Sequence, residues 1–473
     1  MSASVASAPS SVSTDSPVGR MAVRNPSDGT LVGELDAAGL EEVRAAVRAA
    51  RAACPGWAAT DPAVRGQALR AAAAAVAAHA GELADLNNRE TGKPVEEALG
   101  GVAAGVATLE QYAELGPVHR GLSLRGSVLA ADYTVTEPRG VAVLLTPWND
   151  PVAVAAGLIG AALVTGNAVI HKPSERSPHT GALLGDLLSP FFPPGVLATL
   201  TGGAETGSLL SMETGVDVLA HVGSSSSGAR IARAGALTGA HVIRENGGND
   251  PLLIDAGVDP EWAAGQAALG AFSNSGQICT AVERIYVHRD VADAFCEALV
   301  GEARRRNRDA VQAPLVDERL RTAVHAQVTE AVRDGAVLAE GGVVPPGPGA
   351  HYPATVLLNC TQQMAVFTEE TFGPVAPVQV VDSFDEGLAL AAGDRFGLAA
   401  TVLTPLIDSA HRAVAALPVG TVKINTVFGG APGGSAQPRG ESGSGFGYGP
   451  ELLDEFSLVK VVHVGIPQMP GQK

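Results

Sequence analysis

The stretch GVAVLLTPWNDPVAVAAGLIGAALVTGNAVIHKP, residues 140–173, sets the fold class. Two short apolar runs rich in β-branched residues, 140–147 and 168–173, flank a longer run of small apolar residues at 152–164. Strands that are almost continuously apolar and alternate with helices are typical of a parallel sheet covered on both faces. The run 152–164 is too short and too rich in Gly and Ala to span a membrane. We therefore predict an α/β fold.

Further helices and strands are expected on both sides of this unit. The pattern over 39–92 is helical, with Asp61-Pro62 as an N-cap and N1 pair and Gly92 as a stop, and a further helix is expected over 95–115. The other strands expected in the first series are 132–138, 195–202, 216–223 and 240–246. A second series, which indicates a second α/β unit, comprises 251–256, 284–288, 375–382, 399–404 and 421–425. The Gly-rich stretch 429–449 is interpreted as a long loop and 456–464 as a terminal strand.

The composition of the chain limits its number of domains and the kinds of partner that it can bind. At about 150 residues per domain, 473 residues predict roughly two to three domains. The 32 basic and 49 acidic residues give a formal charge of −17, which argues against nucleic acid and anionic membrane surfaces as partners. Residues 1–20 are rich in Ser, Ala and Pro and lack a secretory pattern, so we expect a disordered tail and a fold that begins near Met21.

The four cysteines have no CxxC pair and no metal-type spacing, so no metal site is predicted. Reduced thiols in a cytoplasmic protein fit this pattern best. Cys54 and Cys296 fall in helical patterns and Cys360 near a strand end, which favours packing roles. Cys279 differs, because FSNSGQICTAVERIYV (272–287) sets it among small polar residues just before an apolar run.

Polar residues at the carboxyl ends of parallel strands mark the usual site in such sheets. Asn149 in TPWNDP could donate its amide to an oxyanion, although an Asx-turn before a helix explains it equally simply. The segment HVGSSSSGARI (221–231) leads from an expected strand into the start of a helix, whose free backbone N–H groups could bind a pyrophosphate. A flexible linker is the alternative interpretation. Glu245 in IRENGGNDP could be a general base or only a turn residue. With Cys279, these parts suffice for acyl transfer through a thioester.

The same residues resemble the aldehyde dehydrogenase superfamily, whose members oxidise aldehydes to acids with NAD(P). The resemblance covers the chain from Arg24-Asn25-Pro26 to about Val464, and Glu245 and Cys279 lie 34 positions apart (279 − 245), as is usual in the family. The matching motifs are ETGKP (90–94), TPWN (146–149), KPSE (172–175), GSSSSG (223–228), ENGG (245–248), GQICTA (276–281), EETFGPV (369–375) and KIN (423–425).

The resemblance implies a fold in three parts. A Rossmann-like NAD-binding domain would hold 21–119 and 139–247, and a catalytic domain 248–447. A small β oligomerisation element would form from 120–138 and 450–464, so that the chain is expected to be a homodimer or homotetramer.

The resemblance also implies residue roles. Cys279 would attack the aldehyde, the Asn149 amide and the Cys279 backbone N–H would bind the oxyanion, and Glu245 would activate the water that hydrolyses the thioester. Glu370 and Phe372 match residues that hold the nicotinamide ribose and ring, and Lys172 and Glu175 match those at the adenosine ribose. The remaining expected cofactor-binding residues are Thr146, Trp148, Gly203, Gly207, Gly223, Ser224 and Asn246.

Several positions depart from the family pattern. Asp150 stands where an aromatic or apolar residue is common, and Asn246 and Asn249 replace the usual Leu and Lys. Ile278 precedes the nucleophile, where relatives that act on anionic aldehydes often carry Arg, so an aliphatic or aromatic aldehyde fits better. Glu175 would repel a 2′-phosphate, which favours NAD, with NADP as the alternative because Arg176 is adjacent. A coenzyme-A-acylating enzyme and a non-catalytic binding protein on the same scaffold are the rival functions.

Overall fold

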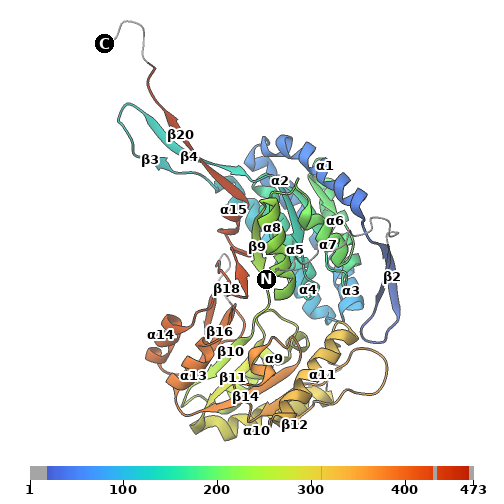
Figure 1. Cartoon of the computed structure of the whole chain (residues 1–473), viewed down its shortest axis with the longest axis vertical. Coiled ribbons are helices and arrows are strands. Elements are labelled where there is room, and N and C mark those ends of the chain that lie inside the picture. The colour runs from blue at the N-terminus through green and yellow to red at the C-terminus, as the bar shows by residue number, and fades with distance from the viewer. Residues whose placement is uncertain (1–18, 310–311, 430–433, 468–473) are drawn as a thin grey trace, which may run out of the picture.

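The computed structural model describes residues 19–309, 312–429 and 434–467. All but the last two residues of the predicted disordered tail lie outside this part of the chain, and the first strand, β1 (Arg20–Arg24), begins where the fold was expected to begin. Figure 1 shows two α/β bodies stacked along the long axis and a thin sheet that projects from the upper one. The predicted α/β fold class is confirmed.

The upper body is built on a six-stranded sheet. Its strand order is β19 (Gly443–Ser444), β9 (His241–Glu245), β8 (Val218–Val222), β5 (Val141–Leu145), β6 (Ala168–Lys172) and β7 (Leu197–Thr199). All neighbours pair in parallel except β19, which runs antiparallel to β9. The helices around it are α1 (Leu40–Ala58), α2 (Pro62–Ala78), α3 (Ala80–Thr91), α4 (Val95–Leu115), α5 (Pro151–Val164), α6 (Pro178–Leu188), α7 (Ala204–Met212) and α8 (Ser225–Thr238).

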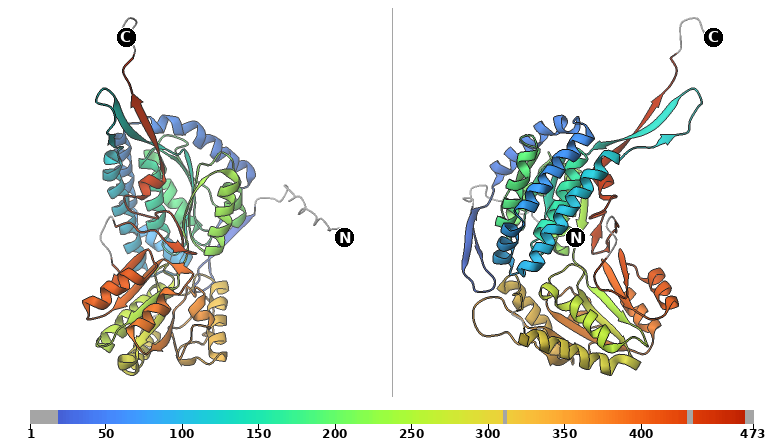
Figure 2. Two further views of the ribbon diagram at one scale, coloured as in Figure 1. Left: turned by 60° about the vertical axis from the view of Figure 1, so that its left-hand side comes forward. Right: turned by 180° about the vertical axis from the view of Figure 1, so that it is seen from behind.

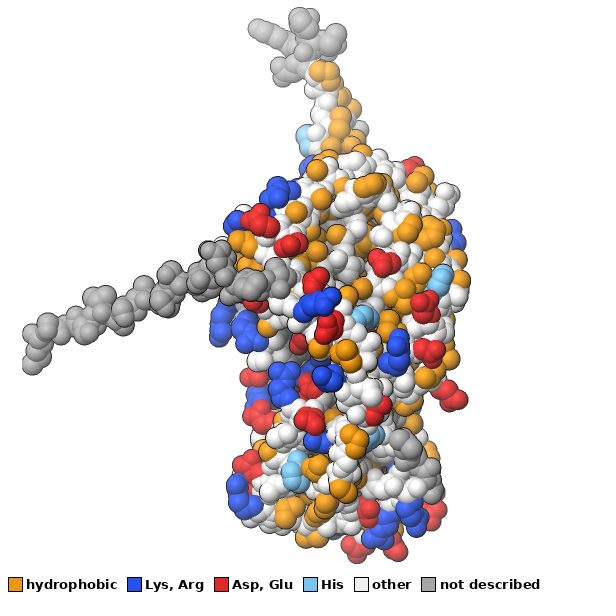
Figure 3. Space-filling view, turned by 90° about the vertical axis from the view of Figure 1, so that its right-hand side faces the viewer, with side chains coloured by type: hydrophobic (Ala, Val, Ile, Leu, Met, Phe, Trp, Pro, Cys, Tyr) orange, Lys and Arg blue, Asp and Glu red, His pale blue; other side chains and the backbone are white. Residues whose placement is uncertain are grey.

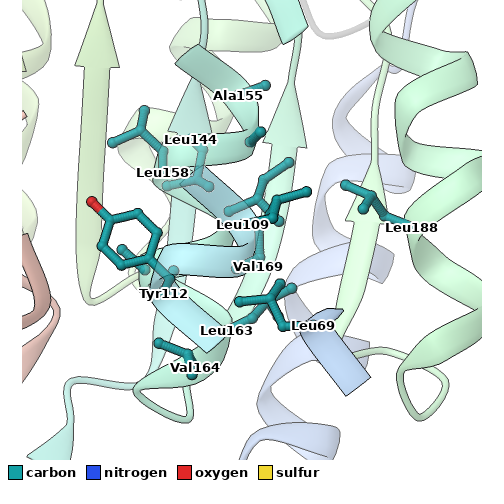
Figure 4. Packing of buried hydrophobic residues seen from close by; sticks show 14 of the residues in the cluster. Leu69, Leu109, Tyr112, Leu144, Ala155, Leu158, Leu163, Val164, Val169 and Leu188 are labelled. Carbon is teal, nitrogen blue, oxygen red and sulfur yellow. The ribbon is translucent and has the colours of Figure 1, made fainter. Parts of the chain in front are cut away.

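Both faces of this sheet are covered, as its continuously apolar strands predicted. Along β5, Leu144 packs into the cluster formed with α2, α4 and α5, whereas Val143 packs into the cluster formed with α1 and α7. Figure 4 shows the first cluster, in which Leu109 and Tyr112 of α4 lie against Leu158 of α5. Small residues on these two helices allow close packing, because a Cβ on Gly105 would lie 3.2 Å from Ala156 Cβ.

The lower body holds a seven-stranded sheet. Its order is β12 (Val337–Glu340), β13 (Thr355–Leu358), β14 (Val375–Val381), β11 (Val282–His288), β10 (Asp250–Ile254), β16 (Ala399–Leu403) and β17 (Thr421–Ile424). Only the β12–β13 pair is antiparallel. The helices of this body are α9 (Pro260–Phe272), α10 (Arg289–Asp309), α11 (Glu318–Arg333), α12 (Ala365–Thr368), α13 (Phe384–Ala392) and α14 (Ile407–Ala416).

A three-stranded antiparallel sheet projects from the upper body, as Figures 1 and 2 show. Its order is β20 (Ser457–Val464), β4 (Ala131–Pro138) and β3 (Ser123–Leu124). Apolar side chains such as Val459 (68% exposed) and Val461 (65% exposed) lie open to solvent on it, and Figure 3 shows hydrophobic atoms running out along this projection. The terminal strand predicted at 456–464 is confirmed.

Capping residues in the sequence correctly predicted the start of α2 and the end of α3. Asp61 caps α2 by accepting a hydrogen bond from the Ala63 N–H at 2.8 Å, and Gly92 ends α3 with a left-handed φ of 76°. The loop predicted over 429–449 was partly wrong, because β18 (Arg439–Gly440) and β19 lie within it. Sequence patterns also missed the hairpin of β1 and β2 (Leu31–Asp36). The short elements that complete the fold are η1 (Gly116–Val118), η2 (Ser189–Phe191), η3 (Ser273–Gly276), β15 (Phe396–Gly397) and α15 (Leu452–Glu455).

Among the described residues, we find no helix both long and apolar enough to cross a membrane.

Candidate active site

Cys279 of the lower body lies in the turn between η3 and β11, which Asn149 of the upper body contacts through the Gln277 carbonyl. The chain curls before it through left-handed backbone at Asn274 (φ 45°) and Ser275 (φ 54°), followed by Gly276. A Cβ on Gly276 would lie 2.1 Å from the Gly373 carbonyl oxygen, so only glycine fits there. The small polar residues that precede the cysteine are therefore needed for the sharp curl.

Gln277 fixes this turn from inside. Its side chain is buried and donates to the Asn274 and Pro314 carbonyls at 3.0 and 3.2 Å. Its Oε1 accepts a hydrogen bond from the Val316 N–H at 2.8 Å. Because both ends of the amide are used, the backbone that leads to the half-buried Cys279 is held in place.

Glu245 ends β9, and the two glycines that follow bring it to the cysteine. A Cβ on Gly248 would lie 3.2 Å from the Cys279 carbonyl oxygen, and one on Gly447 would lie 2.2 Å from Glu245 Oε2. Glycine at 248 thus lets the strand that carries the glutamate pass close to the backbone that carries the thiol.

The electrostatics of this pair favour a protonated thiol at rest. Burial raises the pKa of Cys279, and the nearby carboxylates of Glu245 and Asp250 raise it further, while Lys423 acts in the opposite direction. Burial likewise raises the pKa of Glu245, although contact with the Cys279 thiol partly offsets this. A carboxylate of raised pKa beside a thiol is a suitable acceptor for the proton of that thiol.

Asn149 follows β5 and faces the same turn. Its Nδ2 donates to the Gln277 carbonyl at 3.2 Å, two residues before Cys279, and its own carbonyl accepts a hydrogen bond from Lys93 Nζ at 3.2 Å. The structure therefore brings together Cys279, Glu245 and Asn149, which lie far apart in sequence.

A second group of predicted residues surrounds the end of β6. Lys172 is buried, its Nζ donates to the Pro173 carbonyl, and burial lowers its pKa to about 8 against the effect of Glu175. A Cβ on Gly207 would lie 3.7 Å from Lys172 Cε, while one on Gly203, the N-cap of α7, would meet open space. Lys172 therefore packs beside Gly207 of α7, and the exposed Glu175 follows it closely in the chain.

The segment from Gly223 leads directly into α8, so it is not a flexible linker. Ser224 is the N-cap of this helix, and its hydroxyl accepts a hydrogen bond from the Ser227 N–H at 3.4 Å. The first N–H groups of such a helix are suited to an anion. Thr146 is buried at the end of β5, and its hydroxyl lies 2.9 Å from His171 Nε2.

Trp148 and Phe372 meet edge to face, with ring centroids 5.7 Å apart. Arg176 Cζ lies 5.4 Å from the centre of the Trp148 ring, and Arg176 Nη2 pairs with Asp317 Oδ2 at 2.6 Å. Phe372 has a left-handed φ of 51°, which a side chain such as phenylalanine rarely adopts. A buried interaction must hold it there.

That interaction comes from Glu283, which sequence reasoning missed. Its carboxylate accepts hydrogen bonds from the Thr371 and Phe372 N–H groups at 2.6 and 2.9 Å. The available signal was a charge inside the apolar run AVERIYV. Glu370 lies close by, accepts a hydrogen bond from the Gly248 N–H at 3.2 Å and has its pKa raised to about 7 by burial.

Asn246 has a different setting from the other predicted cofactor residues. Its Nδ2 donates to the Glu441 carbonyl at 2.7 Å, and its backbone N–H donates to the Ser442 carbonyl at 2.8 Å. The donors of Asn246 are thus committed to holding the segment beside β9.

Comparison with known proteins gives one consistent result. The model of the family "Aldehyde dehydrogenase family" matches residues 12–462. Betaine aldehyde dehydrogenase of Rhizobium etli is 33% identical, with 93% of each chain covered, and benzaldehyde dehydrogenase [NAD(+)] of Pseudomonas putida is 34% identical, with 92% of this chain and 91% of the relative covered. A betaine aldehyde dehydrogenase from Staphylococcus aureus, solved in complex with NAD+, superimposes with a TM-score of 0.92 at 28% identity, covering 96% of this chain and 93% of that one.

The family match spans both bodies of the molecule and the segments that carry Asn149, Glu245 and Cys279. The chain therefore belongs to the aldehyde dehydrogenase family.

Proposed function

We propose that the chain oxidises an aldehyde to a carboxylic acid with NAD, through a thioester on Cys279 that Glu245 hydrolyses. The observation that carries the proposal is the close approach at Gly248, where a Cβ would lie 3.2 Å from the Cys279 carbonyl oxygen. This approach brings the segment that follows Glu245 to the turn of Cys279, whose thiol contacts the Glu245 carboxylate. Asn149 bonds to the same turn at Gln277. Nucleophile, base and amide donor are the groups that thioester chemistry requires.

The residues around Lys172 fit NAD. Gly207 leaves space beside Lys172, whose Nζ donates to the Pro173 carbonyl, and the start of α8 offers N–H groups to a pyrophosphate. The Pseudomonas putida relative is named for NAD(+), and the Staphylococcus aureus structure holds NAD+. We place Glu370 and Phe372 at the nicotinamide end.

NAD is favoured over NADP by the neighbours of Glu175. This carboxylate is exposed and would repel a 2′-phosphate. The adjacent Arg176 could compensate for this charge, but it is paired with Asp317 and lies over Trp148. Its guanidinium is thus already engaged.

In the first half of the reaction, Glu245 takes the proton of Cys279, and the thiolate sulfur forms a bond to the aldehyde carbon. The oxyanion that develops is stabilised by the Asn149 Nδ2 donor and by the Cys279 backbone N–H. NAD, when bound, supplies the acceptor for the hydride that the former aldehyde carbon must lose. The resulting acyl group stays on the Cys279 sulfur as a thioester.

Before the second half, Glu245 releases the thiol proton to solvent. It then takes a proton from water, and the water oxygen attacks the thioester carbon. The C–S bond breaks, the acid leaves, and the Cys279 sulfur regains a proton from Glu245. The raised pKa of Glu245 suits both proton transfers, because it makes this carboxylate a stronger base than an exposed glutamate. Asn149 serves the oxyanion in both halves.

Two substitutions test this chemistry. In Cys279→Ala, NADH production should fall to background. In Glu245→Gln, the first turnover of NADH should be slow, because the thiol has lost its proton acceptor, and the reaction should then stall with the acyl-enzyme visible by mass spectrometry of the intact protein. Unchanged NADH production in Cys279→Ala would exclude the mechanism.

A coenzyme-A-acylating reaction would use the same thioester but would transfer it to a thiol. Glu245 beside Cys279 favours hydrolysis, because it provides a base for water. Adding coenzyme A to the steady-state reaction and measuring acyl-CoA distinguishes the two outcomes. We expect free acid alone.

We further propose that the chain forms a homodimer or homotetramer through the projecting sheet of β3, β4 and β20. Strand β20 is at the edge of that sheet and carries exposed valines, which suits addition to a partner's sheet. Light scattering of the purified protein tests the assembly. We keep the division into NAD-binding parts (21–119 and 139–247) and a catalytic part (248–447) as a proposal. The two sheets support it except at β19, which pairs with β9 of the upper sheet. The four free cysteines fit a reducing cytoplasm.

A further inference from the structure

A charged pair lies next to the oxyanion donor. Asp150 Oδ1 lies 3.2 Å from Lys93 Nζ, and that same ammonium donates to the Asn149 carbonyl at 3.2 Å. The Lys93 side chain is only 9% exposed, whereas that of Asp150 is 39% exposed. The lysine is thus enclosed, while the carboxylate keeps an open face beside a site that must admit an aldehyde.

The position of this carboxylate is set by a glycine on α4. A Cβ on Gly101 would lie 2.4 Å from Asp150 Oδ1 and 3.8 Å from Lys93 Nζ. Although Asp150 is the N-cap residue of α5, its side chain makes no capping hydrogen bond to that helix. It is turned toward Lys93 and Gly101 instead, so the usual structural role of an N-cap aspartate does not explain it.

The Asp150 carboxylate can accept further hydrogen bonds. Within the described part of the chain, its Oδ1 has the single ion pair to Lys93, and its Oδ2 accepts no hydrogen bond. Lys93 also acts on Glu97, which is close to Asp150 and near Arg306. One enclosed ammonium therefore faces two carboxylates, and an additional donor would find an unsatisfied acceptor at Asp150.

The carboxylate is also close to the reacting sulfur. Asp150 is adjacent to Asn149, whose amide contacts the turn two residues before Cys279. The charge of Asp150 contributes to the raised pKa of the Cys279 thiol. A short aldehyde bound at Cys279 would thus have its far end within range of this acceptor.

We propose that Asp150 is a specificity-determining residue that selects short aldehydes carrying a hydroxyl or ammonium donor a few bonds from the carbonyl. This inference rests on the proposed function and adds the substrate class to it. Such a donor would bind Oδ2 without breaking the pair with Lys93. Carboxylate-bearing aldehydes would be repelled, and purely apolar ones would gain nothing from the charge.

Three substrates of equal size test the proposal: butanal, 3-hydroxypropanal and 3-aminopropanal, each assayed with NAD. In the wild-type protein, kcat/KM for the two donor-bearing aldehydes should exceed that for butanal by about 10-fold or more, as expected of a hydrogen bond to a charged group. In Asp150→Asn, this preference should fall by about 10- to 100-fold, while the value for butanal changes by less than about threefold. Asp186→Asn, an exposed aspartate on α6, is the matched control and should keep the preference.

Gly101→Ala provides a second variant that keeps the charge. Its Cβ would displace the Asp150 carboxylate, so the preference should fall here too, even if Asp150→Asn proves unstable. An equal loss for all three aldehydes in Asp150→Asn would mean that Asp150 only supports Asn149, and it would overturn the proposal. So would a wild-type preference for butanal. Oxidation of butanal with NAD, lost in Cys279→Ala, tests the thioester chemistry separately.

Discussion

Replacing Asn149 by alanine removes the proposed oxyanion donor and leaves the backbone contact of this residue in place. The side-chain Nδ2 makes one hydrogen bond in the free protein, to the Gln277 carbonyl at 3.2 Å. The other contact of this residue, from Lys93 Nζ to the Asn149 carbonyl, uses the backbone and survives the substitution. The variant therefore removes a single donor without removing the contact that positions the chain.

The two effects differ greatly in size. Loss of the Gln277 contact should cost about 0.5–1.5 kcal/mol of unfolding free energy, as for an ordinary hydrogen bond. Loss of one of two oxyanion donors should lower kcat by about 10²- to 10³-fold, equivalent to roughly 3–4 kcal/mol of transition-state stabilisation. KM should change little, because the donor acts mainly on charge that develops after binding.

The assay follows NADH formation from butanal at saturating NAD, with urea unfolding measured in parallel. Asn307→Ala is the control for lost amide contacts, because this side chain on α10 donates to the Ala354 carbonyl and to Glu340 and accepts from the Ala354 N–H. It should show a larger loss of stability than Asn149→Ala and an unchanged kcat. If Asn149→Ala lowered kcat by less than about fivefold while remaining folded, Asn149 would not be an oxyanion donor.

Two further predictions concern stability. Glu90 is buried and accepts four hydrogen bonds from the backbone N–H groups and side chains of His179 and Thr180. Glu90→Ala should therefore lower the free energy of unfolding in urea by about 2–4 kcal/mol. A loss below about 1 kcal/mol would contradict this account. A hydrogen bond with His241 is the main reason why the pKa of Glu455 is lowered from the usual 4.5 in the folded protein. The contribution of Glu455 to folding stability is therefore present above pH 4.5, and it is lost as the pH falls through the pKa of the folded state. Glu455→Gln should therefore destabilise the protein at neutral pH and reduce the loss of stability on acidification. An unaltered pH dependence of unfolding would show that the contact contributes nothing.

Sequence patterns predicted the regular part of the fold because its signals are local. The apolar runs at 140–147 and 168–173 became β5 and β6, and the capping pair at Asp61-Pro62 began α2. Short or half-exposed strands such as β1 and β12 lack that pattern, since their burial depends on distant neighbours.

The candidate site was recognisable for a different reason. Cys279, Glu245 and Asn149 stand at strand ends or turns with unusual neighbours, and the family resemblance connected them. Contacts between residues that are far apart in sequence could not be predicted from these local patterns. The carboxylate of Glu283 binds backbone N–H groups 88 and 89 positions away, and Gly101 makes room for Asp150, 49 positions away (150 − 101). Such pairs depend on the tertiary arrangement alone.

The antiparallel pairing of Gly443 with Glu245 has a practical consequence for protein engineering. A Cβ on Gly443 would lie 2.0 Å from the Arg244 carbonyl oxygen, and one on Gly447 would press on the Glu245 carboxylate. A mutant library that treats 443–449 as a freely variable surface loop would thus disturb the proposed general base whenever Gly443 or Gly447 is replaced. Screens for new substrates would gain more from positions on α4 such as Gly101, which lies against Asp150.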